Sequence, residues 1–256
     1  MILSPSRPQL IAILFRRLQA TMGPQNWWPA ASAFEVILGA YLTQNTAWTN
    51  VELAMENLRR AQTLTPQAIL QMEISKLEEL VRPAGYFRQK AERLKLFAAH
   101  LETRHGGSLR RMFAQPTGQL RAELLALKGI GPETADSILL YAAQHEVFVV
   151  DTYTRRIFER HGLSRAGDAY EGIRLAVEEA FAAGLGTAEK PGELGVTLEI
   201  HPPSAASRLP RSAKSHDYNE FHALLVQTAK HFCLKKEARC EECPLREFLP
   251  SGKAKL

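Results

Sequence analysis

The stretch LKGIGPETAD, residues 127–136, decides the fold that we expect for this chain. Apolar positions at spacings of three and four predict one helix that ends just before it and another that runs to Ala143. Gly129 and Gly131 flank one apolar residue, which lets the backbone turn tightly, and Pro132 suits the first turn of the following helix. We therefore expect a helical hairpin whose turn exposes backbone N–H groups.

The turn of this hairpin suits contact with a phosphate. N–H groups on a tight turn can hold a nucleic-acid backbone independently of base sequence, which positions a duplex without reading it. A Gly-x-Gly also occurs in plain connections between helices, and the hairpin taken alone leaves that interpretation open.

A carboxylate follows the second helix of the hairpin in the segment VVDT, residues 149–152. Asp151 comes directly after an apolar run and opens a new helix at Thr152. An aspartate that is held there, partly removed from water, exerts a stronger electrostatic effect than one on the surface. A plain helix N-cap is the alternative, and the hairpin at this spacing favours a functional carboxylate.

Length and composition are those of an ordinary globular protein. The 256 residues and 28.6 kDa fit one large or two small domains. Hydrophobic residues at 45%, charged residues at 23% and a mean hydropathy of −0.20 exclude collagenous, mucin-like and wholly disordered chains. A net charge of +5 is compatible with a polyanionic partner.

No run reaches the roughly 18–20 apolar residues of a membrane span, and the N-terminus favours a helix over a signal peptide, so we expect a cytoplasmic protein without membrane contact.

The rest of the chain favours an all-α fold. About ten segments have helical periodicity, and only residues 147–150 resemble a strand. Residues 186–215 are rich in Pro, Gly, Ser and Ala and predict a long, mobile surface insertion. Helix boundaries are expected at one proline and three glycines: Pro66, Gly85, Gly162 and Gly184.

Three cysteines gather near the C-terminus. Cys233, Cys240 and Cys243 lie within eleven residues, which argues against a disulfide framework spread over a secreted fold. Clustered thiols indicate a metal ion or a metal cluster instead.

Taken together, these motifs make the chain resemble the helix–hairpin–helix DNA glycosylases of the endonuclease III superfamily over nearly its whole length. The resemblance implies two all-α domains with a catalytic cleft between them. A six-helix barrel would span residues 25–145, with the hairpin at about 122–143, and a second domain would combine residues 1–24 and 146–256. Enzymes of this kind flip a damaged base out of a duplex and cleave its N-glycosidic bond. The stretches that carry the resemblance are ILGAYLTQNTAWTNVELAMENL, RPAGYFRQKAERLK, LKGIGPETADSILLYA, VVDTYTRRIF and the cysteine block.

The resemblance also implies roles for single residues. Asp151 matches the catalytic aspartate of the family, and Gln44 matches the residue that fills the gap left by the flipped nucleotide. A surface amide of no special function is the alternative for Gln44. Contacts with the DNA backbone are implied at the hairpin and at nearby cations: Lys128, Gly129, Gly131, Thr134 and Arg155, with Arg156, Arg88 and Lys90 as further candidates.

One position separates the branches of this superfamily. In bifunctional members, a lysine two residues after the last glycine of the hairpin attacks C1′ of the sugar. Glu133 stands there in this chain, and a carboxylate cannot form an imine, so we expect a monofunctional enzyme without lyase activity.

The chain is most similar to the branch that removes 3-methyladenine and related alkylpurines, in which aromatic side chains form the base pocket. Trp27, Trp28 and Trp48 match these aromatics, and Glu133 would attract a cationic base from the same pocket. Packing in the core is the alternative for each tryptophan.

The cysteine spacing C-x6-C-x2-C matches the first three ligands of the loop, here residues 233–249, that holds a [4Fe–4S] cluster in the family. The fourth position is Leu249, and the chain has no other cysteine. Another ligand such as His231 or Glu247 could complete the cluster, or one iron could stay open to an exogenous group. Zinc could bind instead, or the cluster could be absent.

The expected protein is a monomeric glycosylase that acts on double-stranded DNA with a damaged base. Two alternatives stay open. One is a glycosylase for another lesion, such as an oxidised pyrimidine, hypoxanthine or a mismatched base. The other is a DNA-binding lesion sensor without activity, against which Asp151 argues.

Overall fold

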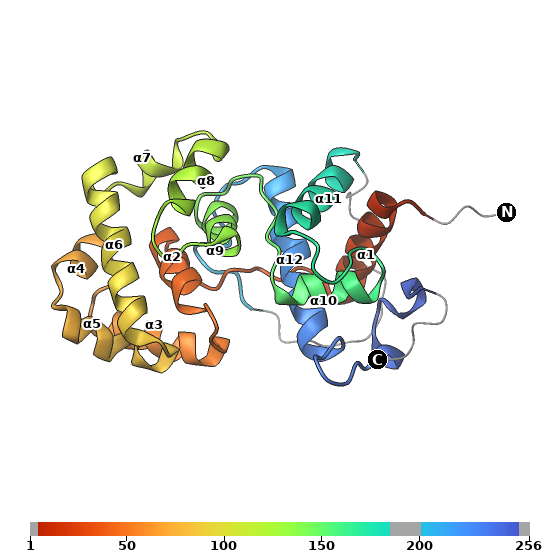
Figure 1. The fold of residues 1–256 in the computed structure, drawn as a ribbon, viewed down its shortest axis with the longest axis horizontal. Helices are drawn as coiled ribbons and strands as arrows, with labels where there is room; N and C mark the ends of the chain where they lie inside the picture. The colour runs from red at the N-terminus through yellow and green to blue at the C-terminus, as the bar shows by residue number, and fades with distance from the viewer. Residues whose placement is uncertain (1–4, 185–200, 251–256) are drawn as a thin grey trace. The chain divides into compact units, whose positions relative to one another are not determined.

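The computed structural model describes residues 5–184 and 201–250, and every regular element within these ranges is a helix (Figure 1). Within these ranges, twelve α-helices and four 3-10 or π-helical segments confirm the all-α fold. The strand-like residues 147–150 have no regular secondary structure. None of the helices in the described ranges is both long and apolar enough to cross a membrane.

The chain divides into two compact units. Unit 1 comprises residues 1–29, 146–204 and 210–256, and unit 2 comprises residues 30–145 and 205–209. Residues 25–29, which we expected in the barrel domain, therefore group with unit 1. Residues 205–209 join unit 2, where the backbone N–H of Ala206 donates to the carbonyl of Ala30 at 3.0 Å.

Unit 2 is built around a buried helix, α2 (Ala33–Leu42). All residues from Phe34 to Leu42 in this helix are buried. The helix packs against the long helix α6 (Phe87–His105), against α9 (Pro132–Ser137) and against the π-helical segment η2 (Ile138–Ala142). The other elements of unit 2 are α3 (Trp48–Arg60), α4 (Pro66–Gln71), α5 (Ile74–Val81), η1 (Arg82–Ala84), α7 (Leu109–Phe113) and α8 (Thr117–Leu125).

The expected hairpin is present in unit 2 and joins α8 to α9. Gly129 has φ +86°, a left-handed conformation that side chains disfavour, and the N–H of Ile130 closes the turn onto the carbonyl of Leu127 at 3.1 Å. Arg121 on α8 donates to both carboxylate oxygens of Asp136 on α9, at 2.7 and 3.0 Å. Because the Asp136 side chain is fully buried, this bidentate ion pair fixes the two helices of the hairpin to each other.

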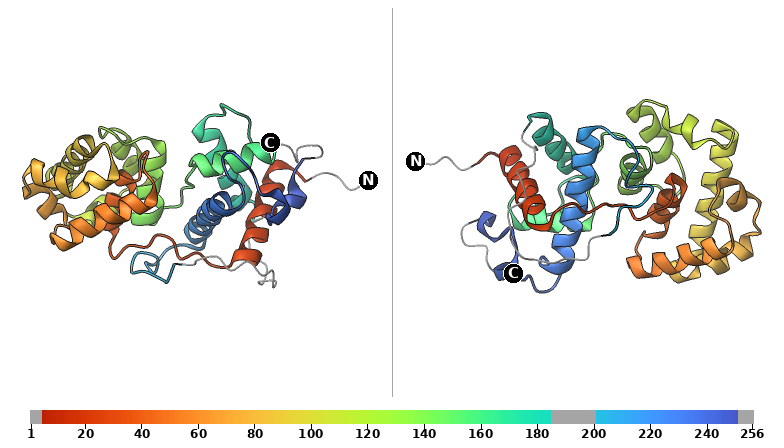
Figure 2. Two further views of the ribbon diagram at one scale, coloured as in Figure 1. Left: turned by 90° about the horizontal axis from the view of Figure 1, so that it is seen from below. Right: turned by 180° about the vertical axis from the view of Figure 1, so that it is seen from behind.

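Unit 1 has an aromatic core between its helices. The helix α12 (Ala213–His231) packs against α1 (Arg7–Met22) and α10 (Thr152–Arg160), and α1 also packs against α11 (Tyr170–Ala182) (Figure 2). The short segments η3 (Cys240–Glu242) and η4 (Arg246–Phe248) follow. The rings of the core, with centroids 5.2–6.0 Å apart in adjacent pairs, belong to Phe15, Phe148, Phe181, Tyr218 and Phe221.

One expectation for local structure needs correction, and one helix was not predicted. The expected insertion at 186–215 is in part an ordered segment: residues 213–215 form the first turn of α12, and Ser212 caps that helix through a bond from the N–H of Ser215. Residues 185–200 lie outside the described part of the chain. The short helix α7 was missed, because five residues are too few to show a period. The boundaries at Pro66, Gly85, Gly162 and Gly184 are confirmed.

Candidate functional site

Asp151 is the N-cap of α10, and its carboxylate has two partners. Oδ1 accepts a hydrogen bond from the backbone N–H of Thr154 at 2.7 Å, and Oδ2 lies 3.5 Å from Nε2 of His222 on α12. The side chains of Asp151 and His222 are 13% and 9% exposed. The aspartate is therefore both a helix cap and one half of a nearly buried carboxylate–imidazole pair, so the two interpretations of this residue are compatible.

The pair keeps Asp151 ionised. Burial raises the pKa of this carboxyl, but the charge of His222, the contact with its ring and the hydrogen bond from Thr154 outweigh burial and hold the pKa below its usual range. An anion at this point can stabilise positive charge that develops on a bound molecule. Sequence reasoning missed His222, since the periodicity of NEFHALLV predicts a helix and says nothing of which residue faces Asp151.

Glu220, two residues before His222, anchors the tryptophan segment. Glu220 is 3% exposed, and its carboxylate accepts from the backbone N–H groups of Gln25 at 2.7 Å and Asn26 at 3.3 Å. The rings of Trp27 and Trp28 follow, with centroids 5.2 Å apart. Helix α12 therefore contacts both Asp151 and the segment that carries these rings.

The predicted pocket residues differ in burial. Trp28 is 6% exposed and packs as a core residue, whereas Trp27 is half-buried, with its ring centroid 5.4 Å from that of His201. In unit 2, Trp48 begins α3, is half-buried and donates through Nε1 to Glu52 at 2.9 Å. Glu133 is exposed in the first turn of α9.

Gln44 is bound to the hairpin. Its Nε2 donates to the carbonyl of Gly129 and to Oγ1 of Thr134, both at 2.9 Å, and its Oε1 accepts from Nη1 of Arg93 at 2.8 Å. Thr134 is 7% exposed with its hydroxyl turned toward Gln44, so a phosphate contact at this residue would come through its backbone N–H. The predicted gap-filling amide and the predicted phosphate-binding turn therefore form one connected cluster in unit 2.

The candidate cations do not all have free side chains. Arg88 is exposed, and Lys128 is 69% exposed with its ammonium 2.9 Å from Glu92. The guanidinium of Arg155 donates to the carbonyl of Asp168 at 2.8 Å. Arg156 is engaged in the same way, through Nε to the carbonyl of Cys233 at 2.7 Å.

Lys90 is wrong as a phosphate contact. It is 1% exposed, and its ammonium donates to the carbonyls of Leu42 and Ala84 and to the hydroxyl of Thr46 at 2.7–2.8 Å. Burial, with a smaller contribution from the charge of Arg93, lowers the pKa of Lys90 to about 8. Lys90 lies on the same side of α6 as its apolar residues, and this pattern predicts a buried side chain.

The three cysteines border one small cavity. The residues that line it show which side chains would surround a metal cluster bound there. Leu249, in the place of the fourth family ligand, lines the same cavity, as does Arg160, whose Nη1 lies 3.1 Å from Sγ of Cys233. Burial, together with the neighbouring thiols, raises the pKa of Cys243 to about 11. The lining of this cavity offers three thiols, and the side chain of Leu249 stands where a fourth cysteine would be. The full lining is Arg160, His161, Phe232, Cys233, Ala238, Cys240, Cys243, Arg246 and Leu249.

Comparison with known proteins identifies the family to which this chain is similar. Residues 38–183 match the family described as HhH-GPD superfamily base excision DNA repair protein. A protein of Methanocaldococcus jannaschii that is provisionally named as a DNA repair glycosylase, MJ1434, is 40% identical over 241 residues, which cover 94% of this chain and 96% of the relative. The endonuclease III-like protein 1 of Bos taurus is 28% identical over 88% of this chain and 61% of its own length.

Solved structures of the same kind share the fold. The 3-methyladenine DNA glycosylase MagIII of H. pylori, bound to 1,N6-ethenoadenine, matches with a TM-score of 0.68 and 31% identity over 87% of this chain and 97% of that one. A trapped endonuclease III–DNA covalent intermediate matches with a TM-score of 0.70 and 18% identity over 98% of each chain. The family match over more than half of the chain and the relative at 40% identity identify the protein. It belongs to the HhH-GPD superfamily and is a DNA glycosylase of base excision repair.

Proposed function

We propose that this glycosylase excises an alkylated purine such as 3-methyladenine and leaves the DNA strand intact. The observation that carries the proposal is Glu133, which stands where bifunctional members of the superfamily have their nucleophilic lysine. Glu133 is exposed on the first turn of α9. A carboxylate there cannot form the imine on which strand cleavage depends.

Asp151 is the catalytic residue of the proposed reaction. An alkylated purine such as 3-methyladenine is cationic in the nucleotide, so it leaves with the electron pair of the C1′–N bond as a neutral base. The ionised carboxylate of Asp151 stabilises the positive charge that develops on the sugar. Water then adds its oxygen to C1′ and gives its proton to the carboxylate. The lowered pKa of Asp151 suits the stabilisation of this positive charge, since the carboxylate is charged at neutral pH.

An electron-poor base is recognised by electron-rich rings and by negative charge. Trp27 and Trp48 are half-buried aromatic residues of the kind that stacks on such a base. Glu133 adds a carboxylate that attracts a cationic base. The name of the H. pylori relative, a 3-methyladenine DNA glycosylase, supports the same substrate class.

Two lysines of unit 2, Lys90 and Lys128, do not replace the missing nucleophile. Lys90 has the low pKa that suits a nucleophilic amine, but its side chain is 1% exposed and already donates to three oxygen atoms. Lys128 is exposed and paired with Glu92. Neither presents an accessible, activated amine.

Gln44 and the hairpin supply the DNA contacts of the proposal. The backbone N–H groups at Gly129 and Gly131 hold phosphates, and Gln44 leaves the hairpin to hydrogen-bond the orphaned base when the damaged nucleotide is flipped.

Cys233, Cys240 and Cys243 would hold an iron–sulfur cluster through three thiolates, which would order the loop after α12. A brown protein with absorbance near 400 nm would support the cluster, and a colourless anaerobic preparation with three titratable thiols would contradict it.

Borohydride trapping on alkylated duplex DNA tests the monofunctional chemistry. The wild type is expected to release free base and to form no covalent adduct. Strand cutting without added base, or a trapped adduct of the wild type, would overturn the proposal, and an adduct that persists in both Lys128→Ala and Lys90→Met would assign the imine to another lysine. Absence of base release from alkylated purines, with release from an oxidised or mismatched base, would move the enzyme to another substrate class.

A further inference from the structure

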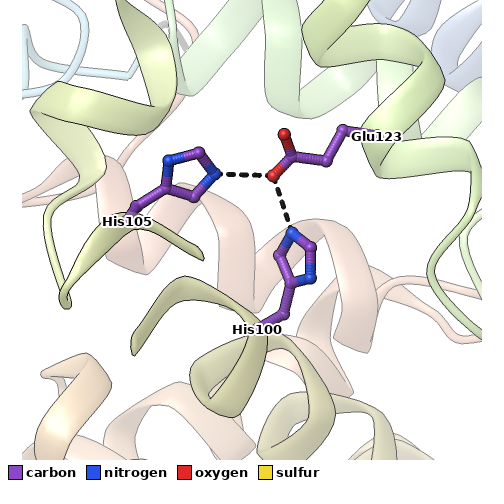
Figure 3. A group of neighbouring side chains, drawn as sticks. All are labelled: His100, His105 and Glu123. Carbon is purple, nitrogen blue, oxygen red and sulfur yellow. Dashed lines mark hydrogen bonds and ion pairs between the residues drawn. The ribbon is translucent and has the colours of Figure 1, made fainter. Parts of the chain in front are cut away.

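Two imidazoles and one carboxylate converge in unit 2, in the part of the structure shown in Figure 3. Nε2 of His100 and Nε2 of His105 each lie 2.6 Å from the same oxygen, Oε1 of Glu123. All three possible ligand atoms lie within 4.8 Å of one another. The side chains are 20%, 11% and 12% exposed, so water reaches the cluster but does not surround it.

Neighbouring groups hold this cluster in place. Gln115 donates through Nε2 to the other oxygen of Glu123 at 2.9 Å, which leaves Oε1 facing the two imidazoles. Arg111 donates to the carbonyls of His105 and Gly106 at 2.7 and 2.8 Å and so fixes the end of α6 that carries His105. Outer hydrogen bonds of this kind orient the ligands in metal sites.

We propose that His100, His105 and Glu123 form a binding site for a divalent transition-metal ion, with Zn²⁺ as the best match. Imidazole nitrogen and carboxylate oxygen suit Zn²⁺, whereas Ca²⁺ and Mg²⁺ prefer oxygen ligands alone. Metal–ligand bonds of about 2.0–2.1 Å in a tetrahedral arrangement place ligand atoms about 3.3 Å apart. The two imidazoles therefore need to withdraw from Oε1 by less than about 1 Å, which side-chain rotation can supply.

The position of the site suggests its effect. His100 and His105 belong to α6, and Glu123 belongs to α8, the first helix of the DNA-binding hairpin. A bound ion would tie the hairpin to the longest helix of unit 2 through bonds stronger than the present hydrogen bonds. Three protein ligands leave one position of a tetrahedral ion open to water. None of these residues takes part in the proposed glycosylase reaction.

Metal binding by the full-length protein tests the proposal. The protein is stripped with a chelator and titrated with ZnCl2 by calorimetry. The cysteines offer a second place for zinc, so the titration is repeated in the triple variant Cys233→Ser, Cys240→Ser, Cys243→Ser. We expect one equivalent bound in the triple variant. At 100 times the dissociation constant, the bound ion should raise the melting temperature by about 5–10 °C.

Variants in the triple background locate the bound ion. His100→Ala and Glu123→Gln are expected to weaken binding at least 100-fold, and Gln115→Ala about 10-fold through loss of ligand orientation. His216→Ala, a change of an exposed histidine in unit 1, is the matched control and should leave binding unchanged. Circular dichroism shows whether each variant is folded, and Glu123→Gln keeps the shape of the native side chain.

Cobalt supplies a second measurement that does not depend on the variants. Co²⁺ on nitrogen and oxygen ligands gives visible bands without the thiolate charge-transfer absorption near 300–350 nm. We expect these bands in the triple cysteine variant and their loss in His100→Ala. Absence of zinc and cobalt binding in the triple variant, or binding unchanged in folded His100→Ala and Glu123→Gln, would show that the cluster is only a hydrogen-bond network and would overturn the proposal.

Discussion

Replacement of Gly131 by alanine separates the folding of the hairpin from its contact with DNA. Gly131 has φ −98° and ψ 179°, an ordinary extended conformation, and a Cβ built on it meets no atom within 4 Å. Alanine lowers the entropy of the unfolded chain, worth about 0.4–1 kcal/mol, and is a poorer N-cap by a similar amount. The two effects offset each other, so the melting temperature should change by less than about 4 °C.

The effect of Gly131→Ala on DNA binding is expected to be much larger. If the backbone at this turn approaches a phosphate, the new methyl group removes at least one hydrogen bond to a charged group, worth about 1.5–3 kcal/mol. The dissociation constant for duplex DNA with an abasic-site analogue, measured by fluorescence anisotropy, should rise about 10- to 150-fold. The slope of log Kd against log salt should not change, because no cation is removed.

Gly129→Ala provides a contrast, because it is expected to destabilise the hairpin itself. Gly129 has φ +86°, and a Cβ there collides with the side chain of Arg93, which would have to leave Gln44. This variant should lose about 1–2 kcal/mol of stability, or about 2–8 °C in melting temperature. Unchanged DNA affinity in folded Gly131→Ala would refute the placement of a phosphate at this turn.

Three further substitutions test other parts of the structure. His222→Asn removes a charge that lowers the pKa of Asp151, so the acid limb of the kcat profile should move to higher pH; an unmoved limb would separate His222 from the aspartate. The same lowered pKa means that the contribution of Asp151 to stability is complete above the usual pKa of aspartate and is lost as pH falls through the folded-state value. Asp136→Asn leaves Arg121 without its buried partner and should cost about 3 kcal/mol in urea unfolding, whereas a loss under 1 kcal/mol would show that the pair does not fix the hairpin. Gln44→Ala should slow base release from duplex DNA more than from single strands, and equal effects on both would exclude gap filling.

The sequence predicts most of the fold, because the local signals agree with the tertiary structure. Apolar periodicity locates the long helices, and a proline or glycine marks many of their ends. Helix α7 has only five residues, and Ser212 caps a helix within a Pro- and Ser-rich segment whose composition indicates a loop. In both places, packing against the rest of the chain decides a structure that local propensity leaves undetermined.

The candidate site is predicted less completely, because its contacts join distant segments. Asp151 stands out by its place after an apolar run, but its partner His222 comes from a helix more than 70 residues later. Lys90 is expected to contact the DNA backbone, whereas its ammonium is buried among acceptors from three other positions of the chain. Pairings of this kind depend on which helix faces meet, and one sequence does not record them.

Excision from duplex DNA that carries alkylated purines, by the wild type and by Asp151→Asn, tests the proposed chemistry most directly. Asparagine also caps helices well, so the variant should fold like the wild type. The wild type should release 3-methyladenine as free base without strand cleavage, and the variant should be slower by at least about 100-fold. Base release by Asp151→Asn within tenfold of the wild type would contradict the role of the aspartate.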